Sequence, residues 1–528
     1  MTLLPSCDIL VVGGGNAGYS AAIAARQAGA QHVVLIDKCP EDWAGGNTYF
    51  TAGAYRTVHG GLDDLLPLVN NVDEKIAQLI DLEPYTEEDF RSDVDRICSG
   101  RSDVALSTAL IQDSNAAIKW LASIGVRFQL SFNRQAYRLD GRHKFWGGLT
   151  LKTEDGGKGL VEDHRRAAQH FGVEVHYSTA LLRLLADPRA SASASGRMHT
   201  AKVLHHDQEH TITAGAIILA GGGFESNPQM RAQFLGPSWD VAKVRGTPYN
   251  TGEVLHIAIH DALAQPSGNW SGCHSVAWDA NAAADTGDRV ASNEFTKSGY
   301  PLGLMVNVNG DRFVDEGVDL RNYTYAKFGR AILEQPESTA FQVWDARTTP
   351  WLRPEEYREE RVQLITASTI EDLAKACAEH GLQQPNNFLR TVKAYNQAVY
   401  AHRSENPGVE WNPAIRDGLS TQSSTQQLAL PKSNWALPLD EAPFVAVKVT
   451  CGITFTFGGL KIDSKTAQVV SSATGQGIPG LYCAGEMVGG LFYQNYPGGS
   501  GLTSGTVFGR RAARAAVASL DIRTQSRL

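Results

Sequence analysis

Three glycines near the start of the chain have the spacing of a nucleotide-binding turn. Gly13, Gly15 and Gly18 form G-x-G-x-x-G between the apolar segment "CDILVV" and an alanine-rich segment. The first glycine permits a tight turn, the second lets the backbone approach a pyrophosphate, and the third lets a helix pack closely on a strand. Asp37 ends the segment "HVVLID", where a carboxylate can bind ribose hydroxyls. A glycine-rich turn without a ligand is the alternative, but the acid in register favours a dinucleotide site.

Further glycine-rich segments follow along the chain: "WAGGNTYFTAG", "AIILAGGGF", "GIPGLYCAGE" and "YPGGSGLTSG". A nicotinamide enzyme does not need them, whereas a flavin is longer, is usually buried, and calls on several segments of bare backbone. We therefore expect FAD as the cofactor. The residues expected to contact it are Gly13, Gly15, Asn16, Ala17, Gly18, Asp37, Lys38, Gly45, Gly46, Asn47, Thr48, Ala220, Gly221, Gly222, Gly485, Glu486, Gly499, Ser500, Gly501 and Leu502.

The last glycine segment opens a predicted helix that follows two tyrosines, Tyr493 and Tyr496. A helix beginning near Ser500 can direct the positive end of its dipole at the electron-rich N1–C2=O edge of an isoalloxazine ring. That arrangement would stabilise reduced flavin.

The elements that must position these residues are those of an α/β protein. Residues 8–38 read as strand, glycine turn, helix and strand, which is a βαβ unit. "VEVHYSTALLRLLAD" and "TITAGAIILAGGGF" read as further strands. Residues 240–435 differ in composition from the rest of the chain, with more Trp, Tyr and Arg and with long polar loops. We predict a Rossmann-like FAD-binding domain in two parts, 1–239 and 436–528, with an inserted α+β capping or substrate domain at 240–435.

The composition excludes several classes of protein. The net charge of −8 argues against a nucleic-acid binder. Seven scattered cysteines without a C-x-x-C pair give no support to a structural metal, an Fe–S cluster or c-type haem, and they favour a reducing compartment. No apolar run is long enough for a membrane span, and the first strand leaves no room for a signal peptide. We expect a cytoplasmic protein, or a peroxisomal one if Ser526, Arg527 and Leu528 act as an S-K-L-like address in a eukaryote.

These motifs resemble the fumarate reductase/succinate dehydrogenase flavoprotein superfamily over nearly the whole chain. The resemblance rests on the first glycine turn, "AGGNT", "ILAGGGFESN", "GDRFVDE", "FTFGGLKID", "GLYCAGE" and the terminal glycine helix. Within the superfamily the chain looks most similar to the FAD-dependent tricarballylate dehydrogenase branch, through "VRGTPYNTGEVL", "DRFVDEGVDLRNYTYAKFGR" and "GEMVGGLFYQNYPGGSGLTSG". The resemblance implies an FAD domain, an inserted cap, and catalysis where the two meet.

The same resemblance implies roles for individual residues. Asn47 stands where some members attach FAD covalently through a histidine, so FAD is expected to bind non-covalently. Arg347, in "FQVWDARTT", matches the arginine that acts as proton donor in soluble fumarate reductases. Glu316 and Arg321 match a proton relay, and His274 matches a carboxylate-binding histidine. A surface ion pair is the alternative reading of each arginine.

Two positions depart from the fumarate reductase pattern. Phe455 and Tyr496 stand where those enzymes hold substrate with a histidine and an arginine. A phenol in place of a cation weakens the grip on a simple dicarboxylate, and Tyr-Pro-Gly also resembles the ketosteroid dehydrogenases, in which a tyrosine polarises a substrate carbonyl. Tyr496, Tyr493 and His274 are therefore the alternatives to Arg347 as groups that handle the proton or the oxyanion.

The function expected from these residues is FAD-dependent oxidoreduction at a CH–CH group. We predict α,β-desaturation next to a carboxylate or carbonyl, or its reverse, with proton transfer through Arg347 and hydride transfer to flavin N5; the expected substrate is a polycarboxylate such as tricarballylate. One alternative is a dehydrogenase, reductase or isomerase of a less polar enone or ketosteroid-like metabolite. Another is a flavin-containing electron-relay or binding subunit. Because the chain has no haem or Fe–S motif, we expect a separate electron acceptor: a partner protein, a quinone route or O2.

Overall fold

The computed structural model describes residues 6–185, 199–282 and 285–525, and its largest sheet is built around the predicted βαβ unit. β1 pairs in parallel with β2 on one side and with β12 on the other. These strands are largely buried, which fits their nearly unbroken runs of Val, Ile and Leu. The strands of this sheet are β1 (Ser6–Val12), β2 (Val33–Ile36), β9 (Glu174–His176), β10 (Thr179–Leu184), β11 (His199–His205), β12 (Gln208–Leu219), β19 (Gln468–Val470) and β20 (Gly477–Cys483).

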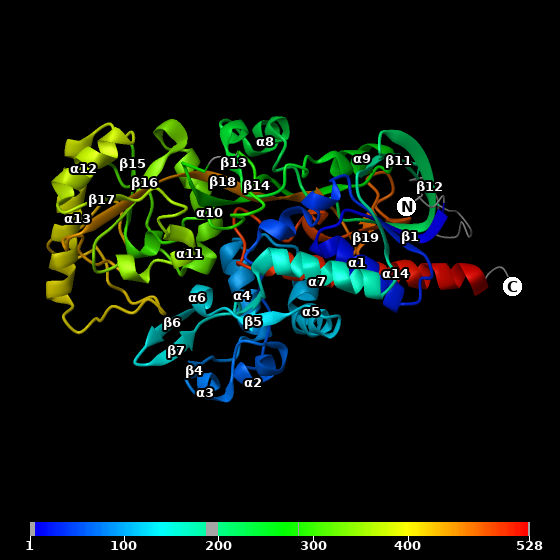
Figure 1. Cartoon of the computed structure of the whole chain (residues 1–528), viewed down its shortest axis with the longest axis horizontal. Helices are drawn as coiled ribbons and strands as arrows, with labels where there is room; N and C mark the ends of the chain where they lie inside the picture. Colours follow the sequence, from blue (N-terminus) through cyan, green and yellow to red (C-terminus); the bar gives the residue numbers. More distant parts are fainter. Residues whose placement is uncertain (1–5, 186–198, 283–284, 526–528) are drawn as a thin grey trace.

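Helices α1 and α14 pack against each other beside this sheet (Figure 1). Small residues make the approach possible: a Cβ on Gly509 of α14 would lie 2.7 Å from the carbonyl oxygen of Ala17 in α1. The two ends of the chain thus meet at the glycine turn. The helices of this part are α1 (Asn16–Gln27), α4 (Glu87–Ile97), α5 (Val104–Ser123), α7 (Gly156–His170), α8 (Pro228–Leu235), α9 (Glu253–Asp261) and α14 (Ser500–Gln525).

A second, six-stranded sheet lies at the other end of the molecule, where α12 and α13 cover it (Figure 1). Its longest strand, β18, pairs with β14, β16 and β17, all antiparallel. Its strands are β13 (Lys243–Val244), β14 (Pro266–Asp279), β15 (Leu304–Asn307), β16 (Ala340–Trp344), β17 (Ile365–Ala367) and β18 (Phe444–Leu460), and its helices are α10 (Tyr325–Leu333), α11 (Pro354–Tyr357), α12 (Ile370–Glu379) and α13 (Pro385–Glu405).

The division of the chain at 239/240 and 435/436 remains a proposal. Five strands of the second sheet fall within 240–435, as an inserted cap would require. β18, however, belongs to the part assigned to the FAD-binding domain and yet pairs within the second sheet. This strand therefore connects the cap to the segments that return to the first sheet.

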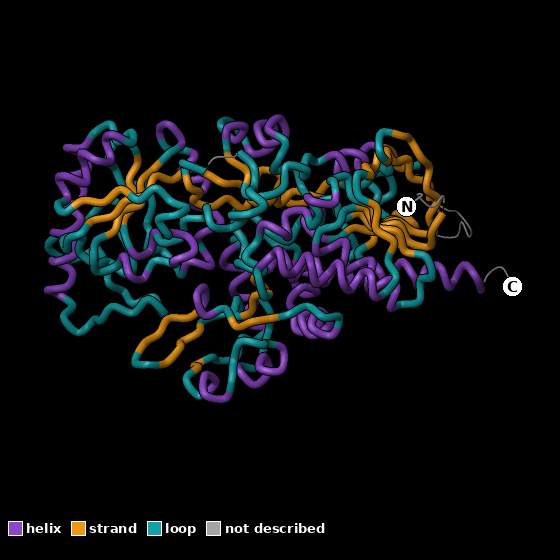
Figure 2. Tube along the Cα trace, viewed as in Figure 1, coloured by secondary structure: helices purple, strands orange, loops and turns teal. Residues whose placement is uncertain are grey.

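Residues 50–153 also build two small sheets, which the sequence did not predict (Figure 2). They contain β3 (Ala54–Tyr55), β5 (Phe128–Leu130) and β8 (Leu151–Thr153) in one, and β4 (Ile80–Asp81), β6 (Ala136–Leu139) and β7 (Arg142–Phe145) in the other, with the short helices α2 (Leu62–Leu65), α3 (Glu74–Ala77) and α6 (Phe132–Gln135). Strands of two to four residues carry little periodicity, so their pattern is easily missed.

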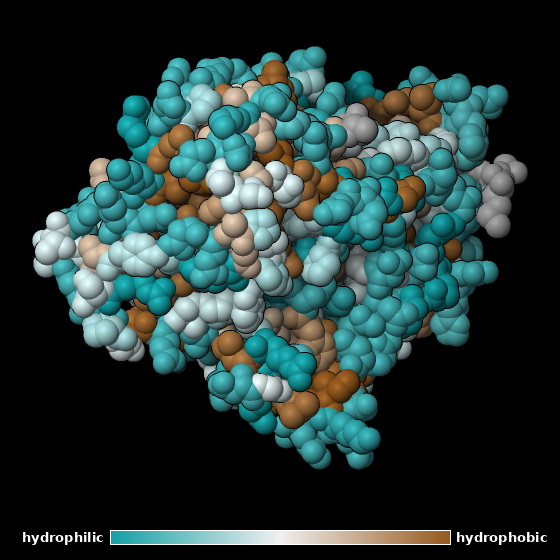
Figure 3. Space-filling view, turned by 60° about the vertical axis from the view of Figure 1, so that its left-hand side comes forward, coloured by the Kyte–Doolittle hydropathy of each residue, from teal (hydrophilic) through white to brown (hydrophobic). Residues whose placement is uncertain are grey.

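Hydrophilic side chains cover most of the face shown in Figure 3, and hydrophobic ones gather in separate groups. All seven cysteines are buried and free. Within the described ranges, no helix is both long and apolar enough to cross a membrane. The tripeptide Ser526–Leu528 lies outside the described residues, so the expectation of a peroxisomal address stays untested.

Candidate active site

One cavity extends from the glycine turn of the first sheet to the cap. All the residues predicted to contact the cofactor line it, with the exception of Gly18, Gly45 and Ser500. Gly18 has the packing role predicted for it, because a Cβ there would overlap the carbonyl of Gly13. Gly45 has a φ of +106°, which favours glycine, and packs against Val161. Ser500 is buried and begins α14.

The glycine turn leaves room for a ligand at Gly15. A Cβ on Gly15 would have no protein atom closer than 3.6 Å, so the protein itself leaves room there. Because Gly15 lines the cavity, a side chain at this position would occupy space that the bound cofactor needs. Helix α1 begins at the next residue with neither a side-chain cap nor an acidic residue in its first turn. Its free N–H groups and dipole therefore favour a phosphate.

The carboxylate of Asp37 is held at the edge of this turn. It accepts hydrogen bonds from the backbone N–H of Gly14 (2.7 Å) and of Cys39 (3.1 Å). Lys38 beside it pairs with Glu253 and donates to the hydroxyl of Thr251 (2.8 Å). Asp37 is thus fixed where the predicted ribose would lie, with further acceptor capacity on its two oxygens.

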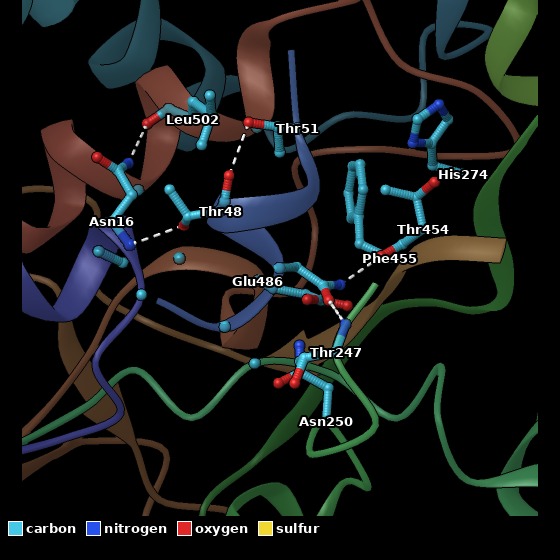
Figure 4. A pocket seen from close by; sticks show the side chains of 18 of the residues that line it. Asn16, Thr48, Thr51, Thr247, Asn250, His274, Thr454, Phe455, Glu486 and Leu502 are labelled. Carbon is cyan, nitrogen blue, oxygen red and sulfur yellow. Dashed lines mark hydrogen bonds between the residues drawn. The ribbon is translucent and has the colours of Figure 1, made fainter. Parts of the chain in front are cut away.

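Asn16 ties three glycine segments together (Figure 4). Its backbone N–H donates to the hydroxyl of Thr48 (2.9 Å), and its side-chain amide donates to the carbonyl of Leu502 in α14 (2.8 Å). The ring of His164 lies within hydrogen-bond distance of its oxygen (2.9 Å). These bonds hold the first turn, the "AGGNT" segment and the N-terminal turn of α14 in one wall of the cavity.

The side chain of Asn47 is fully engaged by the protein. Its amide nitrogen donates to Glu225 and to the carbonyl of Thr454, both at 2.5 Å, and its oxygen accepts from the N–H of Thr247 (2.9 Å). An amide has no imidazole nitrogen to bond to a flavin. Non-covalent binding of FAD therefore remains our prediction.

Two buried carboxyl groups, Glu225 and Glu486, lie next to Asn47. Burial raises the pKa of Glu486 to about 7, and burial together with the charge of Glu486 raises the pKa of Glu225 well above its usual range. Glu486 accepts from the backbone N–H of Thr456 (2.7 Å), and Glu225 accepts from the amide of Asn250 (2.6 Å). One oxygen of Glu225 has no partner among the described residues. The sequence analysis missed Glu225, although it follows "AGGGF" directly.

The turn before α14 accepts only glycine at its closest points. Gly499 has a φ of +86°, and a Cβ on it would overlap Leu149 and lie 2.8 Å from the backbone nitrogen of Arg56. A Cβ on Gly498 would lie 2.9 Å from the ring of Tyr325. The two glycines thus bring the end of the first domain against the start of α10.

The cap end of the cavity brings together His274, Tyr325, Phe455 and Tyr496. The hydroxyls of Tyr325 and Tyr496 are 2.7 Å apart, and the His274 ring lies 5.0 Å from both phenol rings, centroid to centroid. His274 is 1% exposed, and neither ring nitrogen has a partner among the described residues. Burial, and then the charge of Arg245, lower the pKa of His274 well below its usual range, so the imidazole is neutral. Figure 4 shows His274 and Phe455 across the pocket from Asn16.

Four arginines line the same end: Arg134, Arg245, Arg321 and Arg353. Arg245 is buried and donates to the side-chain oxygens of Asn293 (2.9 Å) and Thr454 (3.1 Å). The described part of the chain offers Arg245 no ion pair.

The other three arginines gather around one backbone carbonyl. Arg321 and Arg353 both donate to the carbonyl of Arg134, at 2.6 and 3.1 Å. Glu356 pairs with Arg353 (2.8 Å) and with Arg134 (3.5 Å). Burial, and then the charge of Arg353, lower the pKa of Arg134 to about 10, which still leaves it charged near neutral pH. Of the four guanidinium groups, those of Arg134 and Arg353 thus pair with the carboxylate of Glu356, and those of Arg245 and Arg321 have no ion-pair partner among the described residues.

Three predicted catalytic residues lie outside this cavity. Arg347 pairs with Asp440 (3.2 Å) and Glu441 and donates to a backbone carbonyl, so its charge is already satisfied at the surface of the cap. In this structure Arg347 does not line the cavity, and its ion pairs are those of the alternative reading. Its predicted role in proton transfer stays untested.

Glu316 and Tyr493 also have other partners. Glu316 is buried, pairs with Arg312 and accepts from the N–H of Met305 (2.8 Å), which makes it part of the cap core. The Arg101 guanidinium lies 4.9 Å from the centre of the Tyr493 ring. Of the six residues predicted for catalysis, the structure thus brings Arg321, His274 and Tyr496 to the cavity. It adds Tyr325 and the arginines at 134, 245 and 353.

Comparisons with known proteins identify the family of the chain. Residues 8–502 match the family described as FAD binding domain, so the chain belongs to that family. It is 27% identical over 520 residues to the probable fumarate reductase Ifc3 of Shewanella frigidimarina, an alignment that covers 97% of this chain and 75% of the relative.

Solved structures share the fold. The open conformation of a flavocytochrome c3 fumarate reductase matches with a TM-score of 0.66 at 25% identity, over 97% of this chain and 78% of the other. The 3-ketosteroid delta1-dehydrogenase of Sterolibacterium denitrificans matches with a TM-score of 0.71 at 18% identity, over 98% and 100%. The protein is an FAD-dependent oxidoreductase of the fumarate reductase/succinate dehydrogenase flavoprotein superfamily that acts on CH–CH groups, and the Rossmann-like fold and the cofactor predicted from the sequence are confirmed.

Proposed function

We propose that this enzyme desaturates a polycarboxylate at the carbons α and β to a carboxylate, or catalyses the reverse reduction, with tricarballylate as the representative substrate. The observation that supports it is the charge at the cap end of the cavity, which four arginines line while only two of them, Arg134 and Arg353, pair with a carboxylate, that of Glu356. A buried charge without a partner is costly. A substrate with several carboxylates supplies the missing partners.

Substrate binding divides between two sides of this end. Arg245 binds one substrate carboxylate, because no acidic side chain of the described residues neutralises its guanidinium group. His274 lies close enough for the charge of Arg245 to lower its pKa. Arg321 and Arg353, fixed through the carbonyl of Arg134, offer a second carboxylate a planar, bidentate fork. Phe455 and Tyr496 fill the space where a cation would otherwise hold a smaller diacid.

The proton is handled at the paired phenols in this proposal. Desaturation removes a proton from the carbon next to a carboxylate and a hydride from the adjacent carbon, and a C=C bond forms. Burial, and then the neighbouring Tyr325, raise the pKa of Tyr496 well above its usual range, so its hydroxyl stays protonated and suits the reductive direction. In that direction Tyr496 gives its proton to the carbon next to the carboxylate while a hydride reaches the adjacent carbon. Desaturation is the reverse, in which the removed proton returns to a Tyr496 phenolate. Bound FAD supplies the hydride acceptor. The 2.7 Å contact between the hydroxyls provides Tyr325 as a second proton carrier.

A less polar enone or ketosteroid-like substrate is the second candidate. Phe455 lies 5.2 Å from Phe457 and 5.0 Å from Tyr496, centroid to centroid, and these rings form an apolar wall. Such a wall suits a hydrophobic ring system. A third candidate is an electron-relay or binding subunit without substrate chemistry. Such a subunit would not need the two unpartnered ring nitrogens of His274 in the cavity, so this observation does not favour it.

We further propose that electrons pass to a separate acceptor, either a partner protein, a quinone or O2. The sequence contains no haem or Fe–S motif that would carry them onward within the chain. Residence in the cytoplasm, or in peroxisomes, remains a proposal of the same kind.

Anaerobic mixing of the FAD-loaded protein with candidate substrates tests the assignment. We expect tricarballylate to reduce the flavin, or its unsaturated counterpart to reoxidise flavin reduced beforehand, and steroids and simple enones to do neither. The matched variants are Arg245→Gln and, as a control, Arg390→Gln, which removes an exposed arginine of α13. If an enone or a steroid reduces the flavin and no polycarboxylate does, the second candidate function is the correct one.

A further inference from the structure

A second cleft, of about 670 Å³, opens on the side of α10 that faces away from the catalytic cavity. Its walls come from both parts of the molecule. The end of α4 and residues 494–495 belong to the FAD-binding part, and α10 with residues 318–324 belongs to the cap. The asparagine between the two pockets, Asn495, donates to the carbonyl of Tyr323 (2.7 Å) and accepts from the N–H of Tyr496 (2.9 Å). Asn495, which lines the cleft, is thus bonded to the backbone of Tyr496, which lines the catalytic cavity.

The charge of this cleft is opposite to that of the whole chain. Five cations line it, Arg96, Arg101, Lys327, Arg330 and Arg416, against two carboxylates, Asp319 and Glu334, a local net charge of +3 in a chain of net charge −8. Only Arg96 is neutralised, through ion pairs with Asp93 and Asp319. The other four cations have no ion-pair partner within residues 6–185, 199–282 and 285–525.

The positions of the unpaired cations suit one ligand. Lys327 and Arg330 project from α10, Arg101 follows α4, and Arg416 comes from the loop after α13, so the charges converge from three segments. Thr324, the residue before helix α10, lines this cleft; its side chain does not cap the helix, and the first turn has no acidic residue. The helix dipole therefore adds to the positive potential.

We propose that this cleft is a second anion site, separate from the catalytic cavity, which binds a small molecule with two or more carboxylate or phosphate groups. Such a ligand bridges Arg101 on the FAD-binding side and Lys327 or Arg330 on the cap. It therefore holds the two walls together behind Tyr496. The inference rests on this cleft alone and does not depend on the substrate of the catalytic cavity.

Isothermal titration of the FAD-loaded protein with inorganic pyrophosphate and, in a separate arm, with citrate tests the inference and distinguishes phosphate from carboxylate ligands. The cleft variant is Lys327→Gln/Arg416→Gln, two exposed side chains without ion pairs. The matched control, Arg390→Gln/Lys393→Gln, removes the same charge from exposed positions of α13. Flavin content and spectrum show that each variant has folded.

We expect saturable binding of at least one probe that weakens tenfold or more in the cleft variant, stays within twofold in the α13 control, and returns when Lys327→Arg/Arg416→Lys restores the charges. Arg245→Gln should leave pyrophosphate binding, and the part of citrate binding that the cleft variant loses, within twofold, because Arg245 lines the other cavity. Any citrate bound in the catalytic cavity is a separate part of the signal, which persists in the cleft variant and weakens in Arg245→Gln. Several results would overturn the inference: no saturable binding of either probe, equal binding in the cleft variant, equal loss in the α13 control, or loss in Arg245→Gln of the same binding that the cleft variant loses.

Discussion

The buried, unpaired charge of Arg245 allows a quantitative prediction. Arg245→Gln should bind FAD normally and bind a polycarboxylate about 10- to 150-fold more weakly. Arg245 is buried, and a hydrogen bond to a charged group is worth ~1.5–3 kcal/mol, with about 1.4 kcal/mol for each tenfold change in Kd. The amide of glutamine can still donate to Asn293 and Thr454, the present partners of Arg245, so the local fold should persist.

Two assays measure this change. The first is the concentration of polycarboxylate that half-saturates anaerobic flavin reduction, with Arg390→Gln as the control for loss of an arginine elsewhere. The second is the pKa of His274 by NMR, which should rise in Arg245→Gln because Arg245 lowers it in the parent protein. A half-saturating concentration within threefold of the parent value would refute the assignment of Arg245 to a substrate carboxylate, whatever the pKa of His274 does.

Four further predictions concern other parts of the site. Tyr496→Phe should keep its flavin and slow flavin reduction by ~10²-fold or more, since a positioned proton-transfer group is typically worth ~10²–10⁴; a rate unchanged within threefold would exclude the phenol from the chemistry. Gly15→Val should elute without FAD, because its side chain would fill the cradle at the turn, and a variant with full flavin content would contradict that placement. Arg347→Gln should reduce its flavin within threefold of the parent rate, since exposed ion pairs contribute ~0–1 kcal/mol; a large loss of rate would reinstate Arg347. Burial raises the pKa of Glu486 to about 7, so folding favours its neutral form, and the stability of the FAD-free protein should fall as the pH rises from about 5 through 7. In thermal melts, Glu486→Gln should lose much of this dependence of the melting temperature on pH. An unchanged pH dependence would count against a buried Glu486 that titrates in this range.

The dinucleotide half of the site could be predicted from the sequence because its determinants are local. The turn at Gly13, the strand before it and the acid at Asp37 lie within one βαβ unit, whose spacing fixes their geometry. The remaining glycine segments were recognisable because a backbone that closely approaches a ligand or another segment requires glycine, which is visible in the sequence. The same logic located Gly499, whose φ and surroundings accept no side chain.

The substrate half could not be predicted in the same way. Arg134, Arg245 and Arg353 come from segments more than a hundred residues apart, and only the pairing of β18 with the cap strands and the approach of residues 131–135 bring them to one cavity. Arg347 shows the converse: it follows β16 in a segment that resembles a known pattern, but it pairs with Asp440 and Glu441 and does not line the cavity. Arg353, six residues later, reaches the cavity instead. The three-dimensional path of a loop decides such cases, and spacing alone does not.

Anaerobic single-turnover reduction of the FAD-loaded enzyme by tricarballylate tests the central claim most directly, since it isolates substrate chemistry from the unknown electron acceptor. We predict that visible flavin absorbance bleaches with saturable dependence on tricarballylate in the parent and in Arg390→Gln, and that Arg245→Gln needs at least a tenfold higher concentration. Bleaching by steroids or enones with no response to any polycarboxylate, in either direction of the reaction, would contradict the account.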